Sequence, residues 1–317
     1  MNKRIYPASQ YNHTGDLWVI SCFYNSNSYN TKPRNFEIFI DKIESANLNY
    51  LVVECAFGKQ PFSLKKSPNI IRIRTKDIMW QKERLLNIAV SHLPSKCKKV
   101  AWLDCDLLFE NQDWAKETSF MLNYYKVIQP FKEVIRLPRN ATAYEGIGER
   151  YNGFGYIFKQ NPLAVAEGKF EIHGHTGFAW ASHKGILQKY GFYDVCIAGT
   201  ADHLMAHSFV GDWDTHCVKR IVGKNDSFFN HYLNWSKNIY NSIRSKVAYV
   251  DGQLFHLWHG DVSNRKYVDR ERLLEGHRFD PFKDVELDNN NCWKWRHNNK
   301  ELIEWAQQYF ALRKEDG

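Results

Sequence analysis

Short apolar runs and amphipathic stretches alternate along the first hundred residues of this chain. Four runs have the length and content of buried strands and lie at residues 17–23, 50–55, 70–73 and 100–104. Residues 34–46 and 81–93 carry apolar side chains at helical spacing and are predicted to be helices. The resulting order, β-α-β-β-α-β with short connections, predicts an α/β fold with a mostly parallel central sheet and flanking helices.

The pattern is less regular beyond the fourth predicted strand. It indicates a helix over 113–125, a strand over 126–129, an apolar segment over 178–181 and helices beginning near Lys184 and Asp202. Residues 139–169 are rich in Gly, Asn and aromatic side chains, which is typical of a mobile functional loop. We therefore predict one α/β domain over residues 1–264 and a helical C-terminal extension over 265–317 that packs on it through its tryptophans.

Composition narrows the class of protein. A hydrophobic content of 44% and an aromatic content of 15% over 317 residues exclude a disordered chain and predict a large core. The formal charge of +8 favours an anionic partner, although no run of Lys or Arg is long enough to be a nucleic-acid-binding arm. The seven cysteines form no C-x-x-C pair and are expected to be free thiols. Because the apolar runs are too short to span a bilayer, and the first residues lack a signal-peptide core, we expect a cytoplasmic location without a transmembrane segment.

The strongest chemical signal is the segment VAWLDCDLLFE at residues 100–110. Its hydrophobic run stops at Asp104 and Asp106, and alternate residues of an extended segment share a face, so both carboxylates would project from the end of the strand. Ligands of open α/β sheets bind beyond the carboxyl ends of parallel strands. Two carboxylates in that position suit Mg²⁺ or Mn²⁺ together with the phosphate oxygens of a substrate.

Four sequence stretches, one of which contains the Asp-x-Asp triplet, carry a resemblance to a known class that extends over residues 17–270. They are WQKERLLN at 80–87, WLDCD at 102–106, HTGFAWASHKGILQKYGFYD at 175–194 with GTADHLMAHSFVG at 199–211, and HLWHG at 256–260. Together they resemble the GT-A class of nucleotide-sugar glycosyltransferases, in particular the family-2-like and polypeptide-GalNAc-transferase-like branches and related phage-encoded proteins. The resemblance implies a GT-A type α/β domain, Mn²⁺ or Mg²⁺ as cofactor, and transfer of a sugar from a nucleotide-diphosphate sugar to an acceptor hydroxyl.

The resemblance also implies a set of metal ligands. Asp104 and Asp106 match the D-x-D motif, in which the second aspartate coordinates the metal and the first leans toward the ribose or a metal-bound water. A histidine near the end of the domain commonly supplies another ligand, and His256 and His259 both fall there. His259 is preferred because it lies next to Gly260, but the spacing does not decide between them.

Donor contacts follow from the same resemblance, with a UDP-sugar as the favoured donor. The positions that it places near the nucleotide and its phosphates are Phe23, Tyr24, Glu54, Arg84, Asn87 and Asp104. Glu54 replaces the usual aspartate-rich turn, which leaves the base open. The guanidinium of Arg84 suits a diphosphate, because it can donate to two oxygens at once, yet Arg84 could equally form an ion pair on a helix surface. Lys82 and Glu83 could be an ordinary solvated pair.

Asp202 is the candidate catalytic base, because transfer with inversion needs a carboxylate that removes the proton of the acceptor hydroxyl. It follows GTA at the start of a predicted helix and matches the Gly-x-Gly-Asp position of the family. Two alternatives stay open: a helix N-cap without chemistry and, in a retaining enzyme, a residue that positions the acceptor. The residues expected to shape the acceptor or sugar pocket are His175, Gly177, Phe178, Trp180 and His203. Trp180 could equally be a core residue.

The acceptor is open at this stage. A glycan or a lipid-linked precursor is the default partner of the class. Some phage-encoded relatives are thought to act on hydroxymethylated DNA bases, and the positive charge fits a phosphate backbone, so DNA is the alternative acceptor. In that case an aromatic residue from 144–158 could fill the gap left by a flipped nucleotide. A nucleotidyltransferase ranks lower, because the segment after Phe23 (YNSNSYN) lacks the glycine-rich basic signature of that class. A noncatalytic nucleic-acid-binding protein also ranks lower, because binding alone would not explain the ordered motifs.

Overall fold

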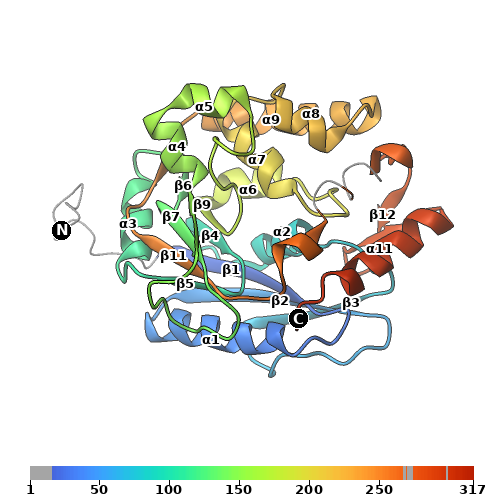
Figure 1. The fold of residues 1–317 in the computed structure, drawn as a ribbon, viewed down its shortest axis with the longest axis horizontal. Coiled ribbons are helices and arrows are strands. Elements are labelled where there is room, and N and C mark those ends of the chain that lie inside the picture. The colour runs from blue at the N-terminus through green and yellow to red at the C-terminus, as the bar shows by residue number, and fades with distance from the viewer. Residues whose placement is uncertain (1–15, 267–268, 270–273, 298) are drawn as a thin grey trace.

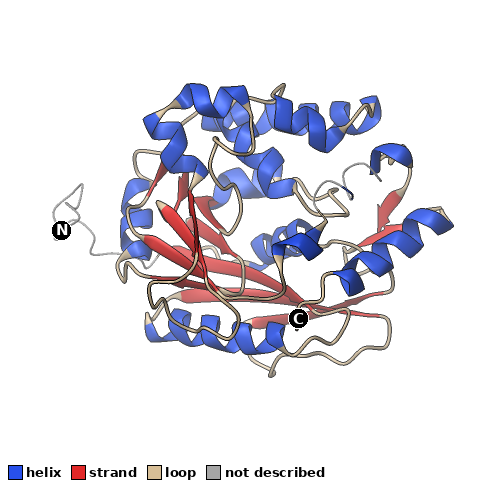
Figure 2. Cartoon of the chain, viewed as in Figure 1, coloured by secondary structure: helices blue, strands red, loops and turns tan. Residues whose placement is uncertain are grey.

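The chain forms a mixed, largely parallel seven-stranded sheet with helices on both faces, as shown by a computed structural model that describes residues 16–266, 269, 274–297 and 299–317 (Figures 1 and 2). The strands are β1 (Leu17–Tyr24), β2 (Asn49–Phe57), β3 (Ile70–Thr75), β4 (Lys99–Leu103), β6 (Val127–Gln129), β9 (Ala179–His183) and β10 (Val247–Tyr249), in the order β10-β6-β9-β4-β1-β2-β3. Only β9 runs antiparallel to its neighbours among these strands. The predicted α/β fold class is therefore confirmed.

Each face of the sheet has its own hydrophobic core, because the strands bury side chains on both sides. Val19 and Phe23 of β1 pack with Phe39 of α1 (Thr31–Ser45), and α3 (Trp114–Met121) extends this core. Ile20 of β1 packs on the other side, where Leu86 belongs to α2. The helices of that second face include α2 (Lys82–His92), α6 (Lys184–Tyr190), α7 (Ala201–Val210), α8 (His216–Val222) and α9 (Asp226–Ile243). The sheet is thus a rigid middle layer, with its strand ends free for a binding site.

A second, four-stranded sheet adjoins the carboxyl end of β4. Its strands are β5 (Leu107–Phe109), β11 (Gln253–His256), β7 (Glu133–Arg136) and β8 (Glu149–Asn152), in the order β5-β11-β7-β8. In the antiparallel β5–β11 pair His256 stands opposite Leu107. That register brings His256, the first residue of the HLWHG stretch, beside Asp106, although 150 positions of sequence separate the two.

Part of the segment expected to be a mobile loop is regular. Residues 139–169 contain β8, α4 (Phe154–Gln160) and α5 (Pro162–Glu167), so the expectation of a single loop is wrong. Short-range capping explains α5: the side chain of Asn161 accepts from the backbone N–H of Ala164, Pro162 occupies the first turn, and Gly168 ends the helix in the left-handed conformation. The dense Gly and Asn content marks helix ends here.

The C-terminal extension was predicted to be helical, but it also contains strands. After η2 (Val262–Arg265) it contains a hairpin of β12 (Val285–Leu287) and β13 (Trp293–Trp295), followed by α11 (Lys300–Leu312). The packing expected of its tryptophans is present, since Trp293, Trp295 and Trp305 cover a small core that includes Phe279. The last residues then return to the body of the molecule, where Asp316 Oδ1 accepts from the N–H of Thr31 at 2.8 Å. A domain boundary at residue 264 stays a prediction. Among the described residues, no helix combines the length and apolar character needed to span a membrane.

Candidate active site

A pocket of about 650 Å³ opens where the predicted chemistry was expected, beyond the carboxyl ends of β1 and β4. Phe23 and Tyr24 reach it from the end of β1, and Asp104 and Asp106 reach it from the turn between β4 and β5. The segment that precedes β9 forms another wall, because β9 is antiparallel and begins at the same edge of the sheet. Residues from these three distant parts of the sequence therefore meet at one cavity.

Asp106, His256 and His259 form a compact group at this edge, here called the strand-end cluster. One ligand atom of each residue lies within 4.8 Å of the others. His259 Nε2 lies 3.1 Å from Asp106 Oδ2 and 3.1 Å from His256 Nε2, and His256 Nε2 lies 3.7 Å from Asp106 Oδ1. Both histidines between which the spacing could not decide thus face the same aspartate.

Chemistry of the strand-end cluster fits a divalent metal. Asp106 Oδ1 is buried and has no hydrogen-bond partner among the described residues, an arrangement that costs free energy unless a ligand satisfies the oxygen. Burial, together with the neighbouring His259, holds the pKa of His256 well below its usual value, so this imidazole is neutral and can offer a lone pair. Burial also raises the pKa of Asp106, against the opposing effect of His259. A carboxylate with two imidazoles suits Mn²⁺ better than Mg²⁺.

Glu315, from the far end of the chain, supports this cluster from behind. Its Oε1 lies 3.5 Å from His259 Nδ1, so a carboxylate orients the imidazole through the nitrogen that faces away from Asp106. Although burial opposes its ionisation, Lys32 and Arg313 hold the pKa of Glu315 well below its usual value. Lys32 Nζ lies 3.3 Å and Arg313 Nε 2.6 Å from this carboxylate.

Asp104 lies in the pocket but outside the strand-end cluster. Its Oδ1 is 2.5 Å from Lys82 Nζ, and its backbone N–H donates to Phe178 O. Lys82 is only partly exposed and its pKa is raised, because the nearby carboxylates of Asp104 and Asp202 outweigh the effect of burial. The two aspartates of the triplet are therefore placed in different electrostatic surroundings, one beside an ammonium group and one beside imidazoles.

Asp202 lies in the first turn of α7 and lines the same pocket. Its Oδ1 accepts from the backbone N–H of His203 at 2.9 Å, which fixes the side chain toward the cavity. Gly177 allows this approach, because a Cβ at that position would lie 2.6 Å from Asp202 Oδ2. Thr200, before the helix, has a φ of 74°, a strained value for a β-branched residue that is typical of functional sites.

Most residues predicted for the acceptor pocket line the cavity. His175, Gly177, Phe178 and His203 do so, whereas Trp180 does not. Trp180 is buried in the core, and its Nε1–H donates to Thr176 O at 2.7 Å, which matches the structural alternative for this residue. Phe178 has a φ of 76° and stacks on the His175 ring at 4.2 Å.

Donor positions divide in the same way. Phe23 and Tyr24 line the pocket, but Glu54, Arg84 and Asn87 do not. Buried Glu54 accepts from the backbone N–H groups of Ser63 and Leu64, and Arg84 and Asn87 both contact Asp194, at 3.0 and 2.7 Å. These polar groups are used within the fold, because they join β2 to its following loop and α2 to the segment after α6. Their geometry gives no support to the donor roles predicted for them.

Several charged residues of the pocket escaped the sequence analysis. Lys82 and Glu83, expected to be a solvated pair, both line the cavity; burial raises the pKa of Glu83 to about 8, and Trp80 Nε1–H donates to its carboxyl at 3.2 Å. Among the described residues, seven cationic side chains line the pocket against five carboxyl groups. The cations are Lys32, Lys82, Arg136, Arg150, Arg220, Arg265 and Arg313. This excess favours an anionic ligand.

No family model matches the chain, and no curated protein matches its sequence. Among solved structures it is similar to a point mutant of β1,4-galactosyltransferase 7 from Drosophila in complex with manganese, UDP-Gal and xylobiose (8% identity, 92% of this chain and 98% of that chain covered, TM-score 0.40). It is also similar to glucosyl-3-phosphoglycerate synthase from M. tuberculosis (9%, 90% and 90%, 0.42) and to 4-diphosphocytidyl-2C-methyl-D-erythritol synthase from Anaerococcus prevotii (9%, 96% and 100%, 0.36). At such TM-scores these similarities do not bear on function.

Proposed function

We propose that this protein is a metal-dependent glycosyltransferase of the GT-A type that moves a sugar from a nucleotide-diphosphate sugar, with UDP-sugars favoured, to an acceptor hydroxyl. The observation that carries the proposal is the strand-end cluster, with its buried unsatisfied Asp106 oxygen, in a cation-rich pocket that also holds Asp202. Asp106, His256 and His259 would hold Mn²⁺ or Mg²⁺. The bound ion would neutralise a diphosphate leaving group and orient it.

The cations of the chain bind the donor in this proposal. Arg265 Nη2 lies 3.1 Å from His259 Nε2, and Lys32 and Lys82 flank the two aspartates, so positive charge surrounds the place where phosphate oxygens would sit. Protonated Glu83 adds no negative charge there near neutral pH, because its pKa is raised to about 8 by burial. Phe23 and Tyr24, at the end of β1, offer aromatic surface for the nucleotide base.

Asp202 acts as the base on the acceptor side. Its carboxylate would remove the proton of the acceptor hydroxyl as the oxygen attacks the anomeric carbon and the bond to the diphosphate breaks. The His203 N–H leaves Asp202 Oδ2 available for this transfer, and Gly177 leaves room for it. His175 and Phe178 form the adjacent wall, where a sugar ring could stack.

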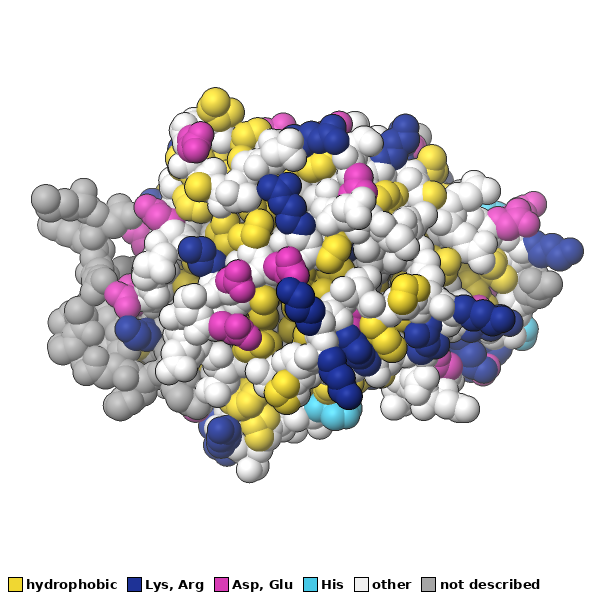
Figure 3. All heavy atoms as spheres, turned by 90° about the horizontal axis from the view of Figure 1, so that it is seen from below, with side chains coloured by type: hydrophobic (Ala, Val, Ile, Leu, Met, Phe, Trp, Pro, Cys, Tyr) yellow, Lys and Arg dark blue, Asp and Glu magenta, His cyan; other side chains and the backbone are white. Residues whose placement is uncertain are grey.

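A glycan or lipid-linked hydroxyl is the acceptor that we propose, with a hydroxymethylated DNA base as the second candidate. Arg150 and the exposed Tyr151 at the pocket wall favour the second, since a cation and an aromatic ring are what a flipped nucleotide needs. The face of the molecule seen in Figure 3 mixes Lys and Arg with Asp and Glu side chains and therefore offers no uniform basic track for DNA.

A donor screen tests the proposed function. Wild-type protein is incubated with UDP-, GDP-, CMP- and dTDP-sugars in the presence and absence of Mn²⁺, and the release of nucleotide is measured by chromatography. We expect metal-dependent hydrolysis of one donor class, reduced at least about 10³-fold in Asp106→Asn, because a buried metal ligand is lost. Mass spectrometry of glycan and hydroxymethylated DNA acceptors then assigns the acceptor.

A matched control for Asp106→Asn is Asp214→Asn, which changes an aspartate whose side chain is 68% exposed and pairs with Lys219. This variant should hydrolyse the donor at the wild-type rate. Folded protein that neither binds Mn²⁺ nor hydrolyses any of these donors would contradict the proposed function.

A further inference from the structure

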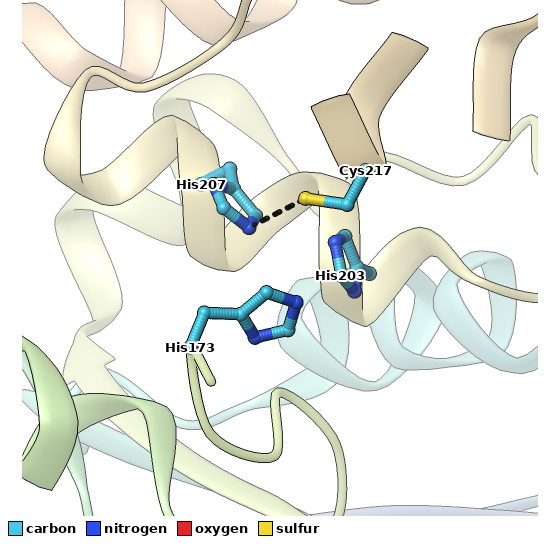
Figure 4. A group of neighbouring side chains, drawn as sticks. All are labelled: His173, His203, His207 and Cys217. Atoms are coloured by element: carbon cyan, nitrogen blue, oxygen red, sulfur yellow. Dashed lines mark hydrogen bonds between the residues drawn. The ribbon is translucent and has the colours of Figure 1, made fainter. Parts of the chain in front are cut away.

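A second group of potential metal ligands lies behind the acceptor side of the pocket. It consists of His173, His203, His207 and Cys217 and is here called the buried cluster (Figure 4). His203 and His207 stand four residues apart on one face of α7, Cys217 lies in the first turn of α8, and His173 belongs to the segment before β9. All four residues are at most 5% exposed.

The four side chains converge on a common centre (Figure 4). One ligand atom from each lies within 4.8 Å of all the others, and Cys217 Sγ is 3.2 Å from His207 Nε2. Zinc bonds of about 2.0 Å to nitrogen and 2.3 Å to sulfur correspond to tetrahedral edges of roughly 3.3–3.7 Å. The observed spread therefore needs an inward shift of about 1 Å at most to meet that geometry.

Three nitrogens of the buried cluster lack partners in the part of the chain that the structure describes. His173 Nε2, His203 Nε2 and His207 Nδ1 are buried and make no hydrogen bond with any described residue. Three such nitrogens in one place are unusual, because buried polar atoms are nearly always satisfied. His173 Nδ1 lies 2.7 Å from Gly174 O, so this nitrogen donates and leaves the Nε2 lone pair directed at the cluster.

Hydrophobic surroundings keep the cluster neutral and ready to bind a cation. Phe154 stands edge-on to His207 at 5.2 Å, and Phe170 covers His203 at 4.7 Å. Burial lowers the pKa of all three imidazoles, that of His207 to about 3, and raises the pKa of the Cys217 thiol to about 11. Without a metal ion, three neutral imidazoles and a neutral thiol would be buried together with few hydrogen-bond partners for their polar atoms.

We propose that the buried cluster binds one Zn²⁺ with four protein ligands, as a structural site separate from the strand-end cluster. Three neutral imidazoles and one thiolate are the ligands that Zn²⁺ takes in tetrahedral sites. Binding displaces the thiol proton of Cys217 to solvent, so the site holds a thiolate and a net charge of one. The ion ties α7, α8 and the segment before β9 together and so fixes the helix that carries Asp202.

Zinc content and cobalt spectroscopy test this site on the intact chain. The protein is purified without added metal, passed through EDTA and gel filtration, and analysed by mass spectrometry for metals; we expect one zinc per chain. X-ray absorption on this sample should show three nitrogen neighbours and one sulfur neighbour. Protein produced in cobalt-containing medium should show the near-ultraviolet charge-transfer band of a cobalt thiolate, and Cys217→Ser should lose that band.

Two control variants separate the buried cluster from other thiols and from the proposed active site. Cys97→Ser changes another buried cysteine, whose thiol donates to Lys99 O, and should keep the band. Asp106→Asn should also keep the band, although it should lower donor hydrolysis at least about 10³-fold. That result would exclude a cobalt ion at the strand-end cluster, bonded to the neighbouring Cys105, as the source of the band. The metal analysis of wild-type protein needs no variant to fold. Folded wild-type protein that carries no zinc and gives no cobalt band, or a band that persists in Cys217→Ser, would overturn the zinc site.

Discussion

The strand-end cluster and the buried cluster both gather histidines, yet they differ in what surrounds them. The strand-end cluster supplies three ligands, opens to a pocket and is ringed by charged groups such as Arg265 and Glu315. The buried cluster supplies four ligands, packs against aromatic rings and contains a thiol, although His173 and His203 also reach the pocket. Catalytic metal sites keep a position open for substrate, whereas structural sites are saturated by protein. The number of ligands and the neighbouring charge thus separate two histidine groups that composition alone would not distinguish.

Asp202→Asn gives the largest expected effect and sharpens this comparison, because Asp202 lines the pocket without belonging to the buried cluster, whereas the adjacent His203 belongs to both. Loss of the base should lower kcat for transfer by about 10²–10⁴-fold with little change in KM for the donor. The cobalt thiolate band should stay at full intensity. Steady-state kinetics and absorption spectra of one preparation measure both properties. An unchanged kcat would remove Asp202 from the chemistry and leave it as an N-terminal helix residue.

Of the two clusters, Glu315→Gln should affect only the strand-end cluster. Glu315 is 2% exposed and pairs with Arg313, so the variant leaves a buried cation without its partner and should lower the free energy of unfolding by about 3 kcal/mol. Mn²⁺ affinity should fall about 10–100-fold, because His259 loses the carboxylate that orients it. Urea unfolding and Mn²⁺ titration measure these changes. The control variant Glu304→Gln, on the exposed face of α11, should change neither the free energy of unfolding nor the Mn²⁺ affinity. Weaker zinc retention in Glu315→Gln would contradict the independence of the two clusters.

Glu83→Gln gives the smallest expected effect and depends on pH. The pKa of Glu83 is raised by burial to about 8, so between its unfolded value near 4.5 and pH 8 the native state binds more protons than the unfolded state. The contribution of Glu83 to the free energy of unfolding is therefore most favourable at low pH, where the side chain is neutral, and it is lost as the pH rises through that window. The variant, which is always neutral, should melt about 4 °C above wild type at pH 8 and close to it at pH 5.

Calorimetry at the two pH values checks this prediction, with Glu37→Gln, a 60% exposed carboxyl, as the control. A melting-temperature difference that is equal at pH 5 and pH 8 would show that Glu83 does not titrate in this range. Because Glu83 lies at the pocket and not at the buried cluster, the cobalt band should be the same in the variant as in wild type.

Sequence patterns were sufficient for the sheet and for part of the site. Apolar runs and an Asp-x-Asp triplet at a strand end are local signals, and they predicted β1 to β4 and the entry of Asp104 and Asp106 into one pocket. The HLWHG stretch marked His256 and His259 but could not choose between them. In the structure the β5–β11 register brings both to Asp106.

The remaining site residues depend on contacts that no local pattern encodes. Glu54, Arg84 and Asn87 sit in suggestive motifs, but tertiary hydrogen bonds use their side chains elsewhere. Glu315 enters the site only because the chain folds back after α11. One missed signal was readable: His203 and His207, in HLMAH, have the helical spacing that places two imidazoles on one face. Their partners, His173 and Cys217, come from other segments and needed the fold.

The return of residues 313–316 to the pocket has a consequence for limited proteolysis. Cleavage before residue 313 would leave the central sheet and its helices in place, since few of their side chains depend on this segment. It would remove the carboxylate that lies behind His259 and the carboxylate of Asp316 that accepts from the first turn of α1. A clipped preparation is therefore expected to be folded but inactive.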